Sequence, residues 1–169
     1  MQESVLFDTG RFSRSSTSPK AHTIANACIK AGVDPDFMHT KLFQHISASQ
    51  IHVLMQALAN MESFFNGKLY IQTIHEEHLN DLEHMDLEYL HDFNSMIENV
   101  SCIAVLRELL NNTVRLSLRS LGPLDISPAI HALGGGGHNK AGGTLLPGPV
   151  SEVKKRLLEV LHPLVKNLP

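Results

Sequence analysis

Residues 134–143 read GGGGHNKAGG, and the rest of the chain can be understood from this stretch outward. The four consecutive glycines carry no Cβ, so main-chain N–H groups there can approach a bulky anion and the backbone can take a positive φ. His138 and Lys140 add side-chain donors where the glycines end. The stretch therefore predicts an anion-binding loop. The alternative is a flexible linker, but such linkers are usually longer and mixed with serine.

A strand-like run lies upstream, at residues 113–120 (TVRLSLRS). Arg115, Ser117 and Arg119 alternate with apolar residues there, and alternate residues of a strand point to one face of a sheet. The run therefore predicts a basic strip on one face and an apolar, buried strip on the other. Together with the glycine loop, we interpret this strip as a site for the phosphates and the end of a short nucleotide chain.

Two common nucleotide-binding fingerprints are excluded by single positions. A dinucleotide fingerprint G-x-G-x-x-G that begins at Gly134 would need glycine at position 139, which is Asn139. A phosphate-binding P-loop would need Ser or Thr after Gly67 and Lys68, and the next residue is Leu69.

The charge pattern favours a small ligand over a long nucleic acid. The 169 residues carry a formal net charge of −3, whereas sequence-independent binding of long nucleic acid depends on a basic surface. Residues 69–106 contain no Lys or Arg, and positive charge returns at Arg107, Arg115, Arg119 and Lys140. A small basic site on an otherwise acidic protein suits a short anionic ligand.

The composition also bears on location. A hydrophobic fraction of 43% is enough for a packed core in one domain or two small ones. No apolar run is long enough to span a bilayer and no signal-peptide pattern is present, which favours a cytoplasmic protein without a membrane segment. Cys28 and Cys102 both have apolar neighbours and are expected to be buried, free thiols.

The apolar periodicity predicts helices in the first part of the chain and mixed elements in the second. Helices are expected to start at Ser18-Pro19 and Asp34-Pro35, and a third covers residues 51–61. After a boundary between Phe65 and Lys68, the expected order is a strand at 68–74, a helix at 81–100, a hairpin of strands 101–106 and 113–120, a helix from Ser127 to Gly134, a strand at 143–146 and a helix from Ser151. This order predicts an α/β fold.

Three motifs resemble those of the DHH phosphoesterases. They are Asp8-Thr9-Gly10-Arg11-Phe12, Ser117-Leu118-Arg119-Ser120, and the four glycines with His138 and Ala141-Gly142. The branch of bifunctional nano-oligoribonucleases and 3′-phosphoadenosine-5′-phosphate phosphatases is the most similar. The resemblance covers nearly the whole chain but only the C-terminal half of the family's usual two-domain protein.

The resemblance implies a domain organisation. Residues 1–48 would be the helical C-terminal end of a DHH catalytic domain, 49–66 a connector helix, and 67–169 a DHH-associated, substrate-binding domain with a mixed sheet. The implied function is recognition of short single-stranded RNA or DNA oligonucleotides, or of nucleotide phosphates, within a hydrolase that uses two manganese ions.

The same resemblance assigns residues to that function. Asp8 would be the last of the family's metal-ligand aspartates. The substrate-binding residues would be Arg115, Ser117, Arg119, Gly134, Gly135, Gly136, Gly137, His138 and Lys140.

The family's other metal motifs, including the Asp-His-His triplet, do not occur in this sequence. One carboxylate cannot hold two manganese ions, so the chain alone is expected to be inactive and to need the missing N-terminal DHH half. Two alternatives stay open: a non-catalytic nucleotide-binding module, and a relative of cyclic-dinucleotide phosphodiesterases. A homodimer is also left open.

A second metal site was considered at His75 and His78, with Glu76 and Glu77 between them. The zincin pattern needs histidines four positions apart, and position 79 is Leu79. No cysteine nearby completes a ligand set, so solvated surface histidines are the favoured interpretation.

Overall fold

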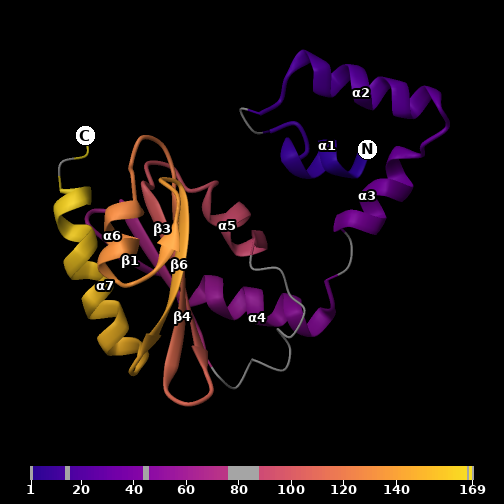
Figure 1. The fold of residues 1–169 in the computed structure, drawn as a ribbon. Coiled ribbons are helices and arrows are strands. Elements are labelled where there is room, and N and C mark those ends of the chain that lie inside the picture. The colour runs from indigo at the N-terminus through magenta and orange to yellow at the C-terminus, as the bar shows by residue number, and fades with distance from the viewer. Residues whose placement is uncertain (1, 14–15, 44–45, 76–87, 167, 169) are drawn as a thin grey trace. The chain divides into compact units, whose positions relative to one another are not determined.

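The computed structural model describes residues 2–13, 16–43, 46–75, 88–166 and 168. The chain forms two compact units, Met1–Ser47 and Ala48–Pro169, which are coloured along the sequence in Figure 1.

The first unit consists of three helices: α1 (Gln2–Asp8), α2 (Pro19–Lys30) and α3 (Pro35–Phe43). The two starts predicted from Ser-Pro and Asp-Pro pairs are confirmed. The Ser18 side chain accepts a hydrogen bond from the Ala21 N–H at 3.3 Å, and the Asp34 carboxylate accepts one from the Asp36 N–H at 2.9 Å. Each side chain thus satisfies an N–H group that a helix start otherwise leaves without a partner.

The second unit is built on a six-stranded mixed sheet with the order β1-β2-β3-β4-β6-β5. The strands are β1 (Glu62–Phe64), β2 (Leu69–Ile74), β3 (Cys102–Leu109), β4 (Thr113–Ser120), β5 (Gly136–Gly137) and β6 (Ala141–Pro147). β2 and β3 are parallel, and the other neighbours are antiparallel. The predicted α/β class with a mixed sheet is confirmed.

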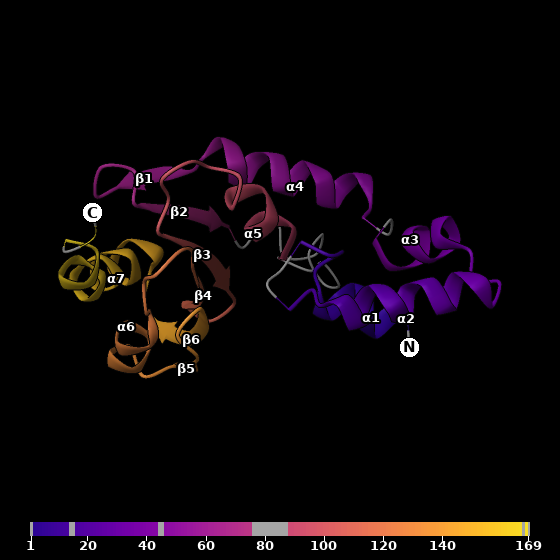
Figure 2. The same cartoon turned by 90° about the horizontal axis from the view of Figure 1, so that it is seen from above.

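Helices cover the sheet on both faces. α6 (Ser127–Ala132) and α7 (Val150–Val165) lie on one face, and α5 (Glu88–Asn94) lies over the other, as the two views of Figures 1 and 2 show. α4 (Ala48–Ala59) packs against β2. Val153, Leu157 and Leu161 recur every four residues on α7 and are fully buried against the sheet. The main core therefore lies between α6, α7 and the sheet.

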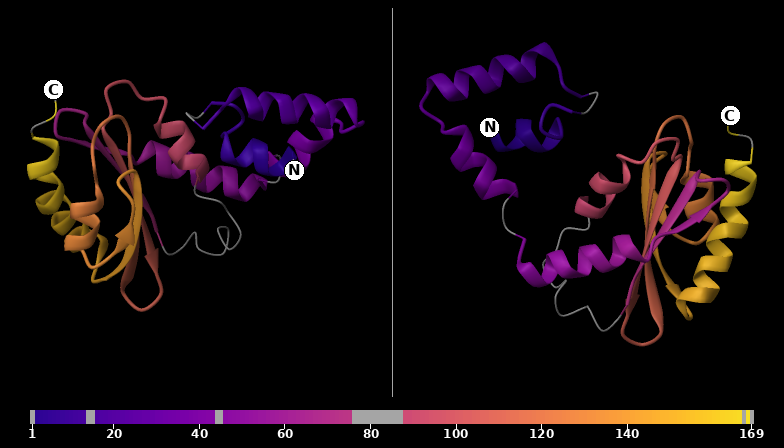
Figure 3. Two further views of the ribbon diagram at one scale, coloured as in Figure 1. Left: turned by 45° about the horizontal axis from the view of Figure 1, so that its top comes forward. Right: turned by 180° about the vertical axis from the view of Figure 1, so that it is seen from behind.

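The hairpin of β3 and β4 follows the prediction closely. Asn111 and Asn112 form its turn with φ of 65° and 55°, a left-handed conformation that asparagine tolerates better than most residues. The hairpin can be followed in both views of Figure 3. It fixes which residues of β4 face each side of the sheet.

The connector differs from the expectation of a helix over 49–66. α4 ends at Ala59, and Glu62–Phe64 pairs with β2 as the edge strand β1. Phe65, Asn66 and Gly67 all have positive φ and form the turn between these strands. The compositional change near Asn66-Gly67 thus marks a hairpin turn.

The helix predicted over 81–100 is shorter in the described residues, and residues 81–87 lie outside them. α5 ends at Asn94, and Phe93 is 51% exposed. Among the α5 side chains that the structure describes, Leu90, His91 and Asn94 are buried. Asn94 exchanges two hydrogen bonds with Gln72 of β2, at 2.8 and 3.0 Å, and this buried amide pair sets the rotation of α5.

α6 starts at Ser127, as predicted. The Ser127 N–H and O–H donate to the Asp125 carboxylate at 2.9 and 2.7 Å. These hydrogen bonds lower the pKa of Asp125.

Both cysteines are free and buried, as predicted. Burial raises the pKa of Cys102 to about 12, so this thiol is unreactive at neutral pH. Among the helices of the described residues, none combines the length and apolar character that a membrane span requires.

Candidate functional site

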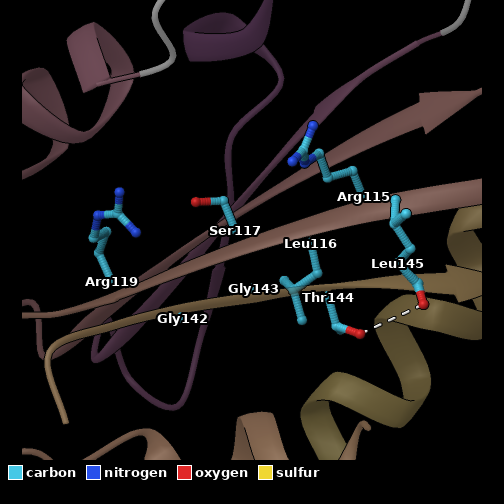
Figure 4. A pocket seen from close by; sticks show the side chains of 8 residues that line it. All are labelled: Arg115, Leu116, Ser117, Arg119, Gly142, Gly143, Thr144 and Leu145. Atoms are coloured by element: carbon cyan, nitrogen blue, oxygen red, sulfur yellow. Dashed lines mark hydrogen bonds between the residues drawn. The ribbon is translucent and has the colours of Figure 1, made fainter. Parts of the chain in front are cut away.

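A strip of polar side chains lies on the face of β4 that points away from α6 and α7. Arg115 is exposed there, and Ser117 and Arg119 are half-buried. Between them, Leu116 and Leu118 are buried in the core on the opposite face. Figure 4 shows the three polar side chains on the same side of the sheet, with Ser117 between the two guanidinium groups. The strip therefore has a hydroxyl donor flanked by two cations.

A cleft of about 350 Å³ runs along this strip. Its lining residues come from β4 and the neighbouring β6: Arg115, Leu116, Ser117, Arg119, Gly142, Gly143, Thr144 and Leu145. The volume is at the lower end of the range for small-molecule sites, which suits one nucleotide unit. Leu145 is 62% exposed and adds an apolar surface next to Arg115.

Strand register places the glycine stretch beside this cleft. Ser117 lies opposite Gly143, and Gly143 lies opposite Gly136 on β5. Arg119 lies opposite Ala141, whose carbonyl oxygen accepts a hydrogen bond from the His138 N–H at 2.7 Å. Neighbouring strands are about 4.8 Å apart, so Gly136 and His138 lie about 10 Å from β4. The strip and the exposed hairpin of β5 and β6 thus belong to one surface.

The four glycines have different structural roles. Gly134, with φ of 76°, ends α6. The Gly134 N–H donates to the His131 carbonyl oxygen and the Gly135 N–H donates to the Ile130 carbonyl oxygen, at 2.9 Å each. This is a Schellman motif, which requires a left-handed residue. A Cβ on Gly135 would lie 2.6 Å from Thr144 Cβ, and one on Gly137 would lie 2.4 Å from the Ala141 oxygen. Gly134 and Gly136 are both exposed with open space where a Cβ would be, but only Gly136 has this space without a positive φ.

This difference predicts opposite outcomes for two neighbouring substitutions. Gly135→Ala should lower the free energy of unfolding by about 1–3 kcal/mol, because its methyl group overlaps Thr144 and the Gly143 carbonyl oxygen. Gly136→Ala should change it by less than about 0.5 kcal/mol. Urea unfolding of both variants measures the difference. Equal destabilisation in both would contradict the assigned roles.

The Lys140 side chain, predicted to contact phosphate, makes two hydrogen bonds within the fold. Its ammonium group donates to the carbonyl oxygens of Gly122 and Leu124, the latter at 3.1 Å. The Ile126 N–H donates to the Asn139 oxygen at 3.1 Å. These bonds tie the loop after β4 to the β5–β6 hairpin.

His91 was missed in the sequence because no spacing pattern marks it. It is only 6% exposed, and its Nε2 lies 3.2 Å from the Ser117 Oγ. α5 thereby reaches the floor of the cleft and holds the hydroxyl group of Ser117. Arg107 of β3 was also missed as a site residue, although it lies directly opposite Arg115.

The predicted metal ligand, Asp8, lies at the end of α1 in the first unit. Arg11 and Phe12 follow it in left-handed conformations with φ of 59° and 66°. The buried Thr9 shapes this turn: its Oγ1 donates to the Val5 oxygen at 2.6 Å and accepts from the Phe12 N–H at 3.0 Å. Asp8 itself is exposed.

The described residues contain no group of three or more His, Cys, Asp or Glu side chains that could hold a metal ion. Two manganese ions need several carboxylate or imidazole ligands, so Asp8 alone could not hold them. His75 Nδ1 lies 2.9 Å from Glu108 Oε2. His78, the other histidine of the disfavoured zinc pattern, lies outside the described residues.

Comparisons with known proteins agree with the motifs. No family model matches the chain. Over 161 residues it is 28% identical to the bifunctional oligoribonuclease and PAP phosphatase NrnA of Thermus thermophilus, an alignment that covers 94% of this chain and 48% of that protein. An exopolyphosphatase-related protein from Bacteroides fragilis superposes with a TM-score of 0.83 at 25% identity, covering 96% of this chain and 49% of the other.

These likenesses support a relation to the DHH-family phosphoesterases. The pGpG-specific phosphodiesterase PggH of Vibrio cholerae shares the fold, with a TM-score of 0.55 at 10% identity over 99% of this chain and 58% of that one. The chain spans about half the length of the curated relative and of the B. fragilis protein.

Proposed function

We propose that this chain is the nucleotide-recognition part of a metal-dependent phosphoesterase that acts on short oligonucleotides or on 3′-phosphoadenosine-5′-phosphate. The observation that carries the proposal is the cleft in which Arg115, Ser117 and Arg119 lie beside the exposed β5–β6 hairpin. The relation to NrnA, described as an oligoribonuclease and PAP phosphatase, supports the substrate class.

Each group in the cleft has a defined task in this proposal. Arg119 donates two parallel N–H bonds to a phosphate, the geometry in which guanidinium groups bind most strongly. Ser117, held by His91, donates its hydroxyl hydrogen to the same phosphate. The bare backbone at Gly136 lets the ligand approach the hairpin, where His138 supplies a further donor. Leu145 contacts the apolar face of a base or sugar.

Hydrolysis would require a second part that carries the metal ligands, because the described residues contain no group of side chains that could hold a metal ion and the motifs supply only Asp8 as a ligand. The relatives are about twice as long as the chain, which is consistent with such a part. In the complete protein, manganese ions would supply the activated water. The residues of this chain would bind the nucleotide and orient its phosphate.

Titration calorimetry with a 5′-phosphorylated diadenylate (pApA) and with adenosine tests the proposal. We expect pApA to bind and adenosine not to bind measurably. The logarithm of the binding constant should fall with the logarithm of salt concentration, with a slope of about −0.7 for each phosphate contact. Equal binding of both ligands, or binding that is independent of salt, would contradict a phosphate-directed site.

A further inference from the structure

Arg107 and Arg115 form a pair of like charges on the face that carries the cleft. The antiparallel register of β3 and β4 places them directly opposite each other, and Ile74 and Leu145 extend the same row across β2 and β6. Side chains at opposite positions have Cβ atoms about 5 Å apart. Arg115 lines the cleft, and the half-buried Arg107 lies beside Arg115 on β3, on the side of β4 away from β6.

Nothing in the described part of the chain neutralises this pair. No carboxylate there makes an ion pair with either guanidinium group. The Nε of Arg107 is buried and has no hydrogen-bond partner among those residues. Burial, and then the charge of Arg115, lower the pKa of Arg107. Like charges opposite each other in a sheet and unsatisfied buried donors both reduce stability.

A residue pair that costs stability without an evident structural benefit is typical of a binding site. Among the described residues this pair has no partner, and an anion with several acceptor oxygens would supply one. A phosphate group meets this need, since it can accept from both guanidinium groups at once. It would also offset the repulsion between them.

We infer that Arg107 and Arg115 form a second phosphate subsite on the same face as Arg119. This inference rests on the proposed function. Arg115 and Arg119 are four residues apart on β4, a distance of about 13 Å along the strand. A single phosphate held at Arg119 therefore leaves the Arg107–Arg115 pair for another phosphate of the same ligand. The face would select nucleotides with two phosphates over those with one.

Paired titrations with pApA, which has two phosphates, and with unphosphorylated diadenylate (ApA), which has one, test the subsite. Arg107→Met should weaken pApA binding about tenfold and leave ApA binding unchanged. The affinity of Arg107→Lys for pApA should lie between the affinities of the wild type and of Arg107→Met. The matched control is Arg156→Met on α7, which should bind both ligands as the wild type does.

Thermal unfolding gives an independent readout. Removing one of two repelling charges should raise the melting midpoint of Arg107→Met in the absence of ligand, by about 2–4 °C. Weaker pApA binding in a more stable variant is a result that simple structural damage cannot produce. Unchanged pApA binding would overturn the subsite, and so would an equal loss for both ligands with a lower midpoint.

The subsite and the proposed function can fail separately. If Arg119→Met weakens the binding of both ligands while Arg107→Met weakens the binding of neither, the subsite is wrong and the proposed function stands. If the wild-type chain binds neither ligand, the proposed function is wrong and the subsite is wrong with it.

Discussion

Arg119→Met is expected to weaken pApA binding by about 10- to 100-fold. Hydrogen bonds to charged groups contribute about 1.5–3 kcal/mol, and each 1.4 kcal/mol is a factor of ten in affinity. Arg119 lines the cleft and lies opposite Ala141 of β6. It is therefore next to the β5–β6 hairpin, which carries His138. Methionine keeps most of the side-chain volume but removes every donor. Titration calorimetry with wild type and variant measures the change.

The control for this prediction is stability. Arg119 is half-buried at the surface of the sheet, so its replacement should change the free energy of unfolding by less than about 1 kcal/mol. Arg156→Met on α7 should leave both binding and stability unchanged. Wild-type affinity in the Arg119 variant would show that the phosphate binds elsewhere.

The second large effect concerns catalysis. The chain alone is expected to release no AMP from pApA above the protein-free background, even with manganese present. A two-metal mechanism needs a set of ligands that holds both ions, and in the described residues Asp8 belongs to no such set. Chromatographic detection of AMP over several hours measures the rate, with the T. thermophilus relative as the positive control.

Release of AMP in proportion to the concentration of the chain would contradict this expectation. In that case, Asp8→Asn would show whether Asp8 takes part. Binding without turnover, by contrast, is the combination that the proposed function requires of this chain.

Local pattern predicted the parts of the site that depend on a single strand. The alternation in TVRLSLRS was enough to place Arg115, Ser117 and Arg119 on one face, because the two-residue repeat of a strand is fixed by the backbone. The asparagine turn at residues 111–112 and the helix end at Gly134 were predictable for similar local reasons.

Long-range register decided the rest. Gly135 has no side chain because α6 and β6 approach each other there, and sequence alone does not show that packing. Lys140 donates hydrogen bonds to two carbonyl groups of a loop that lies 16 to 18 residues away in the sequence. Arg107 faces Arg115 only through the pairing of β3 and β4, and His91 reaches Ser117 only through the packing of α5.

The central claim is that the phosphates of a short nucleotide bind on the surface shared by β4 and the β5–β6 hairpin. Its most direct test is NMR titration of the isotopically labelled chain with pApA. The largest amide shifts are expected at Ser117, Arg119, Gly136 and His138. Shifts confined to α7 and the opposite face of the sheet would contradict it.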